Sequence, residues 1–160
     1  MAIVIIREDL IREDLDEKVP TYLRYDIHAK SGSLYNTPNC WSIYACGKVF
    51  KYLKNIGGLS AMQKINEEKA AILYNFLDNS KMFHGTVEKE YRSLMNVTFV
   101  TGNKELDEKV VAAAKAAGFD NLKGHRSVGG LRASIYNAMP KEGVEALVAF
   151  LEKFENEYKA

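Results

Sequence analysis

The segment HRSVGGLRASIYNAMP, residues 125–140, holds the side chains best suited to chemistry. It places His125, Arg126 and Arg132 around a Gly-Gly pair, just before and within a predicted strand. A guanidinium is a planar fork of five N–H donors that matches the geometry of carboxylate and phosphate groups. Two interpretations stand at this point: ordinary exposed polar residues of a loop and strand, or a site that binds an anionic small molecule.

The Asn-Thr-Pro segment, residues 36–38, is a second candidate for anion binding. Thr37 is suited to cap a helix N-terminus, and Pro38 is suited to the first helical position. A helix N-terminus presents free N–H groups and the positive end of the helix dipole, which together favour bound phosphate. Asn36 and Thr37 would add an amide and a hydroxyl. The alternative is that these residues only cap the helix.

Other kinds of site find little support in the sequence. It contains no recognisable Ser/His/Asp or Cys/His motif and no glycine-rich nucleotide loop. The three histidines are scattered and share no metal-ligand spacing with the two cysteines, so we expect no metal site. Cys40 and Cys46 fall on opposite faces of one predicted helix and indicate buried, reduced thiols of a cytoplasmic protein.

The charge balance limits the class of partner. Lysine and arginine number 22 against 21 aspartates and glutamates, a formal net charge of +1. Such a balance does not attract nucleic acid or an anionic membrane to the whole molecule, so anion recognition must be local. The opening MAIVII is too short for a signal-peptide core or a membrane span.

The N-terminal third predicts helices and one isolated strand. The continuous apolar run IVII at 3–6 is typical of a strand buried on both faces, yet the next sixty residues offer it no partner. Residues 16–35 read as a long connection. A helix is expected from the Asn-Thr-Pro segment to the glycines at 57–58, and a second at about 60–77.

The remaining sequence predicts a compact α+β unit over residues 93–158. It would be an antiparallel sheet with two helices on one face. Along the second strand, apolar residues alternate with Arg132, which places this side chain on the face opposite the helices. The predicted strands and helices lie in the segments 93–102, 104–118, 131–137 and 140–158.

The motifs of this chain closely resemble the C-terminal part of the phosphoserine aminotransferases, fold type I pyridoxal-phosphate enzymes of the class V aminotransferase group. The segments that carry the resemblance are IVIIREDL, YNTP, GKVFKYLK, GGLSAMQKIN, KAAILYNFLDNS, YRSLMNVTF, LKGHRSVGGLRASIYNAMP and EGVEALVAFLEKFE. The fold that it implies is α/β and α+β. Residues 1–66 would end the large cofactor domain, and residues 67–160 would form the C-terminal small domain.

The resemblance also implies an activity. The family transfers an amino group between glutamate and 3-phosphohydroxypyruvate, giving 2-oxoglutarate and phosphoserine for serine biosynthesis. Several bacterial members also serve pyridoxine biosynthesis. The family enzymes are cytoplasmic homodimers that use pyridoxal 5'-phosphate. Arg132 matches the arginine that pairs with the substrate α-carboxylate, and His125 and Arg126 match the pair at the substrate phosphate. Asn36 and Thr37 match the residues that reach the cofactor phosphate of the neighbouring subunit.

The Schiff-base lysine of the family has no counterpart in this chain. In the family it precedes the IVII strand in an Ala-Gln-Lys-Asn context, which this sequence does not contain. No catalytic residue is therefore expected here, and the isolated chain is expected to be inactive. Three interpretations remain: a truncated fragment of the transaminase, one half of a split enzyme, or a stand-alone module that binds a phosphorylated amino acid.

Overall fold

The computed structural model describes residues 1–158 and divides the chain into two compact units. The first unit is Met1–Asn55, and the second begins at Ile56. The domain division expected for the complete protein, between residues 66 and 67, falls inside a helix of the second unit. That division concerns the complete protein and stays a prediction.

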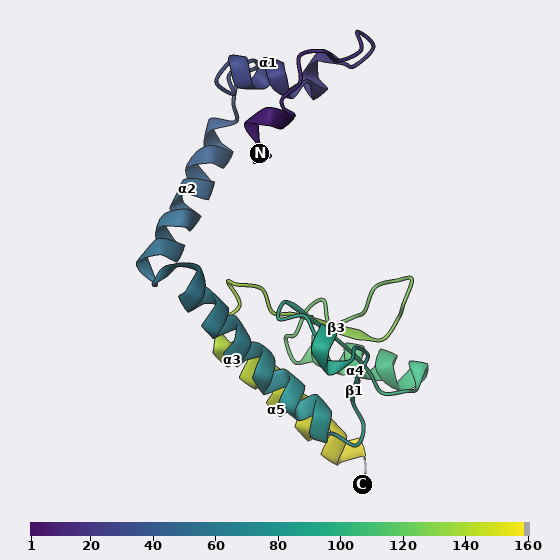
Figure 1. Ribbon diagram of the computed structural model, residues 1–160. Coiled ribbons are helices and arrows are strands. Elements are labelled where there is room, and N and C mark those ends of the chain that lie inside the picture. Colours follow the sequence, from purple (N-terminus) through teal and green to yellow (C-terminus); the bar gives the residue numbers. More distant parts are fainter. Residues whose placement is uncertain (159–160) are drawn as a thin grey trace. The chain divides into compact units, whose positions relative to one another are not determined.

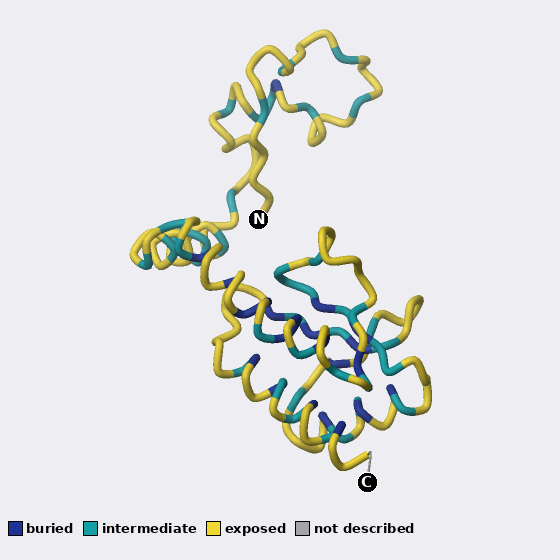
Figure 2. The backbone as a smooth tube through the Cα atoms, turned by 60° about the horizontal axis from the view of Figure 1, so that its bottom comes forward, coloured by how far each residue is buried: buried dark blue, intermediate teal, exposed yellow. Residues whose placement is uncertain are grey.

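The first unit is helical and has no apolar core. It contains the 3-10 helices η1 (Glu8–Leu10) and η2 (Thr21–Leu23) and the α-helices α1 (Tyr25–Lys30) and α2 (Cys40–Asn55) (Figure 1). The one buried residue within Met1–Asn55 is Asp26, which forms an ion pair of 2.8 Å with Arg24. The tube of Figure 2 is accordingly yellow and teal over most of this unit.

The prediction of a strand at residues 3–6 is wrong. Residues 1–7 form neither helix nor strand, and Ile5 is 96% exposed. A strand needs a neighbour to take up its backbone N–H and C=O groups, and no strand lies within Met1–Asn55. The expected connection over 16–35 also differs, because it contains η2 and α1.

The second unit is built on a three-stranded antiparallel sheet. Its strands are β1 (His84–Gly85), β2 (Asn96–Val100) and β3 (Leu131–Ser134), in the order β1-β2-β3. Along β2 and β3, Val97 and Phe99 lie opposite Ala133 and Leu131, and all four residues are buried. The alternate residues of both strands are half-buried, so the sheet has one apolar and one polar face.

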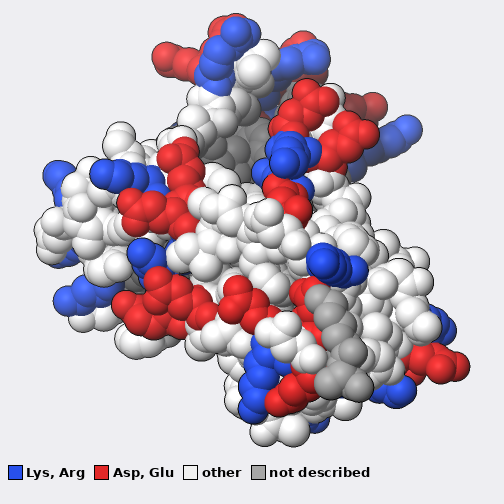
Figure 3. All heavy atoms as spheres, turned by 90° about the horizontal axis from the view of Figure 1, so that it is seen from below, with Lys and Arg blue, Asp and Glu red and all other residues white. Residues whose placement is uncertain are grey.

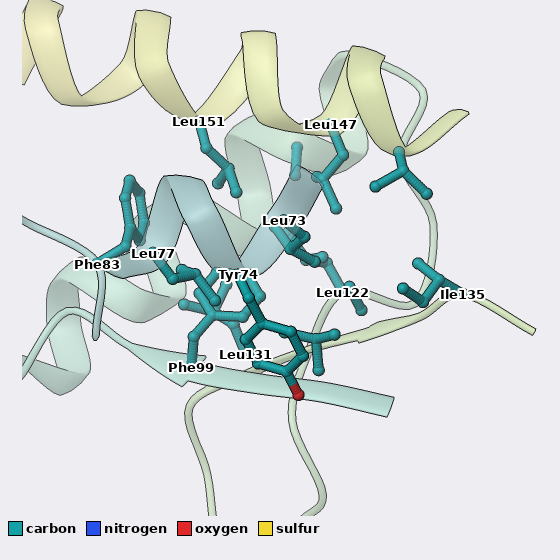
Figure 4. Close-up of a cluster of buried hydrophobic side chains, with 14 of the residues drawn as sticks. Leu73, Tyr74, Leu77, Phe83, Phe99, Leu122, Leu131, Ile135, Leu147 and Leu151 are labelled. Carbon is teal, nitrogen blue, oxygen red and sulfur yellow. The ribbon is translucent and has the colours of Figure 1, made fainter. Parts of the chain in front are cut away.

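Three helices supply the other half of the core: α3 (Gly58–Asn79), α4 (Lys104–Ala116) and α5 (Lys141–Tyr158). Helices α3 and α5 run side by side (Figure 1). Figure 4 shows how their side chains meet those of the sheet, at Leu73, Tyr74, Leu77, Phe83, Phe99, Leu122, Leu131, Ile135, Leu147 and Leu151. The predicted antiparallel sheet with helices on one face is confirmed, but the unit also includes α3 and β1, which lie before residue 93.

A polar cluster fixes the C-terminal end of α3 to the segment before β2. Arg92 donates two hydrogen bonds to the carboxylate of Asp78 and stacks on the ring of Tyr74, with its guanidinium carbon 4.5 Å from the ring centroid. Lys89 adds an ion pair of 3.1 Å to the same carboxylate. Hydrogen bonding to Arg92 is the main cause that lowers the pKa of Asp78 to about 2.

Helix α2 leaves large apolar side chains uncovered. None of its residues is buried, and Trp41 is 75% exposed with its ring stacked on Tyr44. The prediction of two buried thiols is wrong for Cys40, which is exposed, while Cys46 is half-buried; both thiols are free. The physical reason is that α2 packs against no core within its own unit.

Charged side chains of both signs are mixed on the surface, as the balanced net charge of the sequence predicts. Figure 3 shows acidic and basic side chains interspersed over the visible face. Among residues 1–158, no helix is long and apolar enough to cross a membrane. Within the same residues, no three His, Cys, Asp or Glu side chains gather in a way that could hold a metal ion.

Candidate functional site

The arginines of this chain fall into two groups. Arg7, Arg12, Arg24 and Arg92 each pair with an aspartate at 2.5–2.9 Å. Arg126 and Arg132, the remaining two arginines of the sequence, have no ion pair within the described chain. The two unpaired guanidinium groups are therefore those that the sequence assigned to anion binding.

Arg132 lies on β3, on the polar face of the sheet. It stands opposite Thr98 of β2, and its backbone N–H donates to the carbonyl oxygen of Leu122 at 2.8 Å. Its side-chain Nε is buried and has no hydrogen-bond partner within residues 1–158. A buried donor without a partner costs about 1–3 kcal/mol, and an acceptor from outside the described chain would remove that cost.

Hydrogen-bonded polar side chains surround Arg132 on the same face. Asn96 Oδ1 accepts from the hydroxyl of Ser134 at 3.2 Å and from the hydroxyl of Tyr136 at 3.3 Å. The hydroxyls of Thr86 and Thr98 lie 2.6 Å apart. None of these groups is charged, so the guanidinium of Arg132 dominates the electrostatics of this face.

His125 and Arg126 lie on an exposed loop, Gly124–Gly130, that its own backbone closes. The Gly124 N–H donates to the carbonyl of Gly130 at 2.8 Å, and the N–H groups of Val128 and Gly129 both donate to the carbonyl of His125. A Cβ on Gly124 would lie 2.0 Å from the carbonyl oxygen of Gly129, so only glycine fits there. The closed loop thus presents His125 and Arg126 outward.

The loop and Arg132 are anchored to each other through the backbone. Leu122 accepts the hydrogen bond from the Arg132 N–H, and Lys123 pairs with Leu131 as an antiparallel bridge. The chain therefore enters the loop beside β3 and leaves it directly into β3. His125, Arg126 and Arg132 therefore belong to one local structure.

A buried lysine supports the turn that follows β3. Lys69 of α3 is 0% exposed, and its Nζ donates to the carbonyl oxygens of Ile135, Tyr136 and Met139 at 3.4, 2.8 and 3.0 Å. One turn earlier in α3, Asn66 donates to the side chain of Asn137 at 2.8 Å. Burial lowers the pKa of the Lys69 ammonium, and the three carbonyl oxygens satisfy its three N–H donors.

Asn36 and Thr37 belong to the first unit, and the structure corrects their local role. Helix α2 begins at Cys40, and Asn39 caps it, because the Asn39 side chain accepts from the Ser42 N–H at 3.0 Å. Thr37 is therefore not the cap, and Pro38 is not in the first turn. The side chains of Asn36 and Thr37 are exposed and make no hydrogen bond within residues 1–158.

The two free side chains line an open pocket within the first unit. Its volume is about 710 Å³, and it is lined among others by Tyr22, Tyr25, His28, Asn36, Thr37 and Ile43. The ring of His28 is held in place by a 2.8 Å contact between its Nε2 and the carbonyl of Tyr22. The amide of Asn36 and the hydroxyl of Thr37 are available to a ligand there.

Sequence reasoning missed Lys69, Asn96 and Ser127. A signal for Lys69 was present, because it falls on the inward stripe of α3 with Met62, Ala70, Leu73 and Leu77, where a charged residue is rare. Asn96 and Ser127 carry no comparable signal. Their partners, Ser134 and His125, are recognised only once β2 and the loop are in place.

The sequence profile of the family described as Aminotransferase class-V matches residues 14–147. Among curated proteins, the chain is 48% identical over 159 residues to a phosphoserine aminotransferase of Lactobacillus helveticus, covering 99% of this chain and 42% of the relative. It is 52% identical over 157 residues to the phosphoserine aminotransferase of Histophilus somni, covering 98% of this chain and 44% of the relative.

Solved structures give the same result. The phosphoserine aminotransferase from Bacillus circulans subsp. alkalophilus superposes with a TM-score of 0.90 at 46% identity, covering 96% of this chain and 42% of that chain. The phosphoserine aminotransferase from Trichomonas vaginalis, with bound pyridoxal phosphate, gives a TM-score of 0.84 at 37% identity, covering 92% of this chain and 42% of that chain. The resemblance predicted from the motifs is thus confirmed, and the matched region is the C-terminal part of these relatives.

Proposed function

The chain belongs to the aminotransferase class-V family, and we propose that it is the C-terminal part of a phosphoserine aminotransferase. It spans less than half the length of the curated relatives it matches. The complete enzyme would transfer the amino group of glutamate to 3-phosphohydroxypyruvate, giving phosphoserine. This chain would contribute substrate-binding groups to that reaction and no Schiff-base lysine.

The observation that carries this proposal is that Arg126 and Arg132 have no ion-pair partner within the described chain. Phosphoserine and its oxo acid each carry one carboxylate and one phosphate, two anions separated by a short carbon chain. The chain offers two guanidinium groups without internal partners, Arg126 in the loop and Arg132 on the strand that leaves it. Two cationic forks anchored in one local structure match the two anionic ends of such a substrate.

Arg132 would bind the carboxylate. Its Nε is buried, and its strand is fixed by the hydrogen bond to Leu122, so the fork has a set orientation. A carboxylate accepting two parallel N–H bonds from this group would be held in one plane, with its α-carbon placed reproducibly. His125 and Arg126 are exposed on the closed loop and would bind the phosphate, whose larger charge needs more donors.

Pyridoxal phosphate is the cofactor that we propose for the complete enzyme, and Asn36 and Thr37 fit part of it. Their amide and hydroxyl have no partner within residues 1–158 and lie just before the N-terminus of α2, a combination suited to a phosphate group. When bound, this cofactor supplies the electron sink that amino-group transfer requires. Asn36 and Thr37 would only hold its phosphate.

The partners follow from the same proposal. The complete enzyme would be a cytoplasmic homodimer, in which Asn36 and Thr37 serve the cofactor of the neighbouring subunit. The exposed apolar side chains of α2, among them Trp41 and Phe50, support the view that further protein covers this helix. The alternative of a stand-alone module that binds a phosphorylated amino acid would rest on Arg126 and Arg132 alone.

A chimera tests the proposal directly. The chain would replace the matching C-terminal part of the Lactobacillus helveticus relative, in a bacterial strain that lacks phosphoserine aminotransferase and requires serine. We expect growth without serine, and glutamate-dependent formation of phosphoserine by the purified chimera. The same chimera with Arg132→Met should fail in both assays, because the carboxylate loses its bidentate partner.

Two controls make the outcome decisive. The parent enzyme must support growth in the same strain, and the chimera must elute as a folded protein of the parent's oligomeric state. A folded chimera of that state without phosphoserine formation would overturn the proposal. The chain alone should show no transamination. If the folded chimera forms no phosphoserine while the chain alone still binds phosphoserine through Arg132, the module interpretation gains support instead.

A further inference from the structure

Ser127 holds the imidazole of His125 through two contacts to one nitrogen. The Ser127 hydroxyl oxygen lies 2.6 Å from His125 Nδ1, and the Ser127 backbone N–H donates to the same Nδ1 at 3.3 Å. A backbone N–H is only a donor, so Nδ1 must be the acceptor in that bond. The hydroxyl must then also donate to Nδ1, because a proton on Nδ1 would face the Ser127 N–H.

The consequence is a defined tautomer. In a neutral imidazole one nitrogen carries the proton and the other accepts, so an accepting Nδ1 places the proton of His125 on Nε2. A phosphate monoester dianion offers acceptors only, so it can bind a neutral imidazole only through the nitrogen that carries a proton. The backbone of the loop keeps this arrangement in place, since the His125 carbonyl accepts from both Val128 and Gly129.

We propose that Ser127 is a positioning residue that fixes His125 in its Nε2–H tautomer and ring orientation, so that Nε2 donates to the phosphate of the substrate. The phosphate part of this inference rests on the proposed function; the tautomer does not. Ser127 itself touches no ligand in this scheme. It acts by removing the rotational and tautomeric freedom that an exposed histidine otherwise has before binding.

The sequence offers an internal reference for the test. His84 is exposed on β1, and its imidazole makes no hydrogen bond within residues 1–158. It therefore reports an unconstrained ring in the same spectrum. A matched pair of variants isolates the hydroxyl, because Thr and Val have nearly the same shape: Ser127→Thr keeps the donor and Ser127→Val removes it.

The experiment is nitrogen NMR of the imidazole side chains in the full chain at alkaline pH, where histidine is neutral. For wild type and Ser127→Thr we expect the Nδ1 chemical shift of His125 to be that of an unprotonated nitrogen. The Nδ1 chemical shift of His84 should lie closer to that of a protonated nitrogen. For Ser127→Val we expect the His125 resonance to move toward the His84 value, because only the longer backbone contact of 3.3 Å then remains at Nδ1. A protonated Nδ1 in the wild type, or an unchanged spectrum in Ser127→Val, would overturn the proposal.

Titration with O-phosphoserine separates this inference from the proposed function. We expect Ser127→Val to bind about threefold to tenfold more weakly than Ser127→Thr, the effect of one side chain that must become ordered on binding. Equal affinities would overturn the role of Ser127 in phosphate binding and leave the proposed function standing. If the wild-type chain does not bind O-phosphoserine, the phosphate role fails together with the ligand assignment, and the tautomer spectrum alone then decides whether Ser127 orients His125.

Discussion

The Nζ of Lys69 donates a hydrogen bond to the carbonyl oxygen of Tyr136 across 2.8 Å, although the two residues are 67 positions apart. The same ammonium reaches the carbonyls of Ile135 and Met139. A single side chain of α3 thereby ties down the turn between β3 and α5. The end of the strand that carries Arg132 depends on it.

Replacing Lys69 should therefore destabilise the second unit. Lys69→Met keeps the length and apolar character of the stem but leaves carbonyls that were satisfied in the core without donors. We expect the free energy of unfolding to fall by about 2–3 kcal/mol, measured by urea denaturation followed by circular dichroism. The matched control is Lys64→Met on the exposed side of α3, which should change it by less than about 0.5 kcal/mol. Equal stability of the two variants would contradict this account.

Arg132, unlike Lys69, should be needed for binding and not for the stability of the fold. Its Nε is buried without a partner, so Arg132→Met should leave the free energy of unfolding unchanged or raise it by up to about 1 kcal/mol. Arg92→Met should lower it by about 1–3 kcal/mol, because it leaves the carboxylate of Asp78 without its main partner. Thermal and urea unfolding would measure both variants. A marked loss of stability in Arg132→Met would mean that this arginine serves the fold.

The lowered pKa of Asp78 predicts how the free energy of unfolding depends on pH. Its pKa is lowered to about 2 in the folded chain, so the folded state binds fewer protons than the unfolded state between about pH 2 and 4. The stabilisation is complete above that range and disappears as the pH falls through about 2. At pH 7, Asp78→Asn should cost about 1 kcal/mol, discounted for the partial exposure of the pair. Urea midpoints of both proteins should converge below pH 2, whereas Asp120→Asn, at an exposed position, should follow the wild type throughout.

Alanine substitutions at Gly124 and Gly129 of the loop should have different effects on binding and stability. Gly124→Ala places a Cβ 2.0 Å from the carbonyl oxygen of Gly129, so the loop must open and phosphoserine binding should be lost. Gly129→Ala has free space around the new Cβ and only the strain of its positive φ of 79°, which costs about 1–2 kcal/mol. Isothermal titration with phosphoserine, together with urea unfolding, would compare the two. Unaltered binding by Gly124→Ala would show that loop closure is not needed.

The elements that the sequence predicted well are those decided by local pattern. Helix α5 and strand β3 could be located from periodicity, since Val144, Leu147 and Leu151 recur at helical spacing and Leu131 and Ala133 alternate with polar residues. The start of α2 was predicted two residues early, with Thr37 as the cap and Pro38 as the first helical residue. Thr37 and Asn39 are both good caps, and only the folded backbone shows that Asn39 accepts from Ser42.

The rest depended on contacts that lie far apart in the sequence or outside Met1–Asn55. Lysine is usually exposed, and Lys69 is buried because carbonyls beyond residue 134 receive its protons. The apolar run at 3–6 needs neighbouring strands that its own unit does not supply, so its pattern alone could not produce a strand. Arg126 and Arg132 could be proposed for anion binding from residue type, but the absence of internal partners is visible only in the folded chain.

Trp41 gives this chain a built-in optical probe. It is the single tryptophan of the sequence, and it is 75% exposed at the start of α2, a few residues after Asn36 and Thr37. Excitation selective for indole therefore reports on this helix end and on no other part of the molecule. In the chain by itself the emission should be red-shifted and open to quenching by iodide. Any phosphate group, protein surface or second subunit that covers the end of α2 should move the emission to the blue and protect it from the quencher.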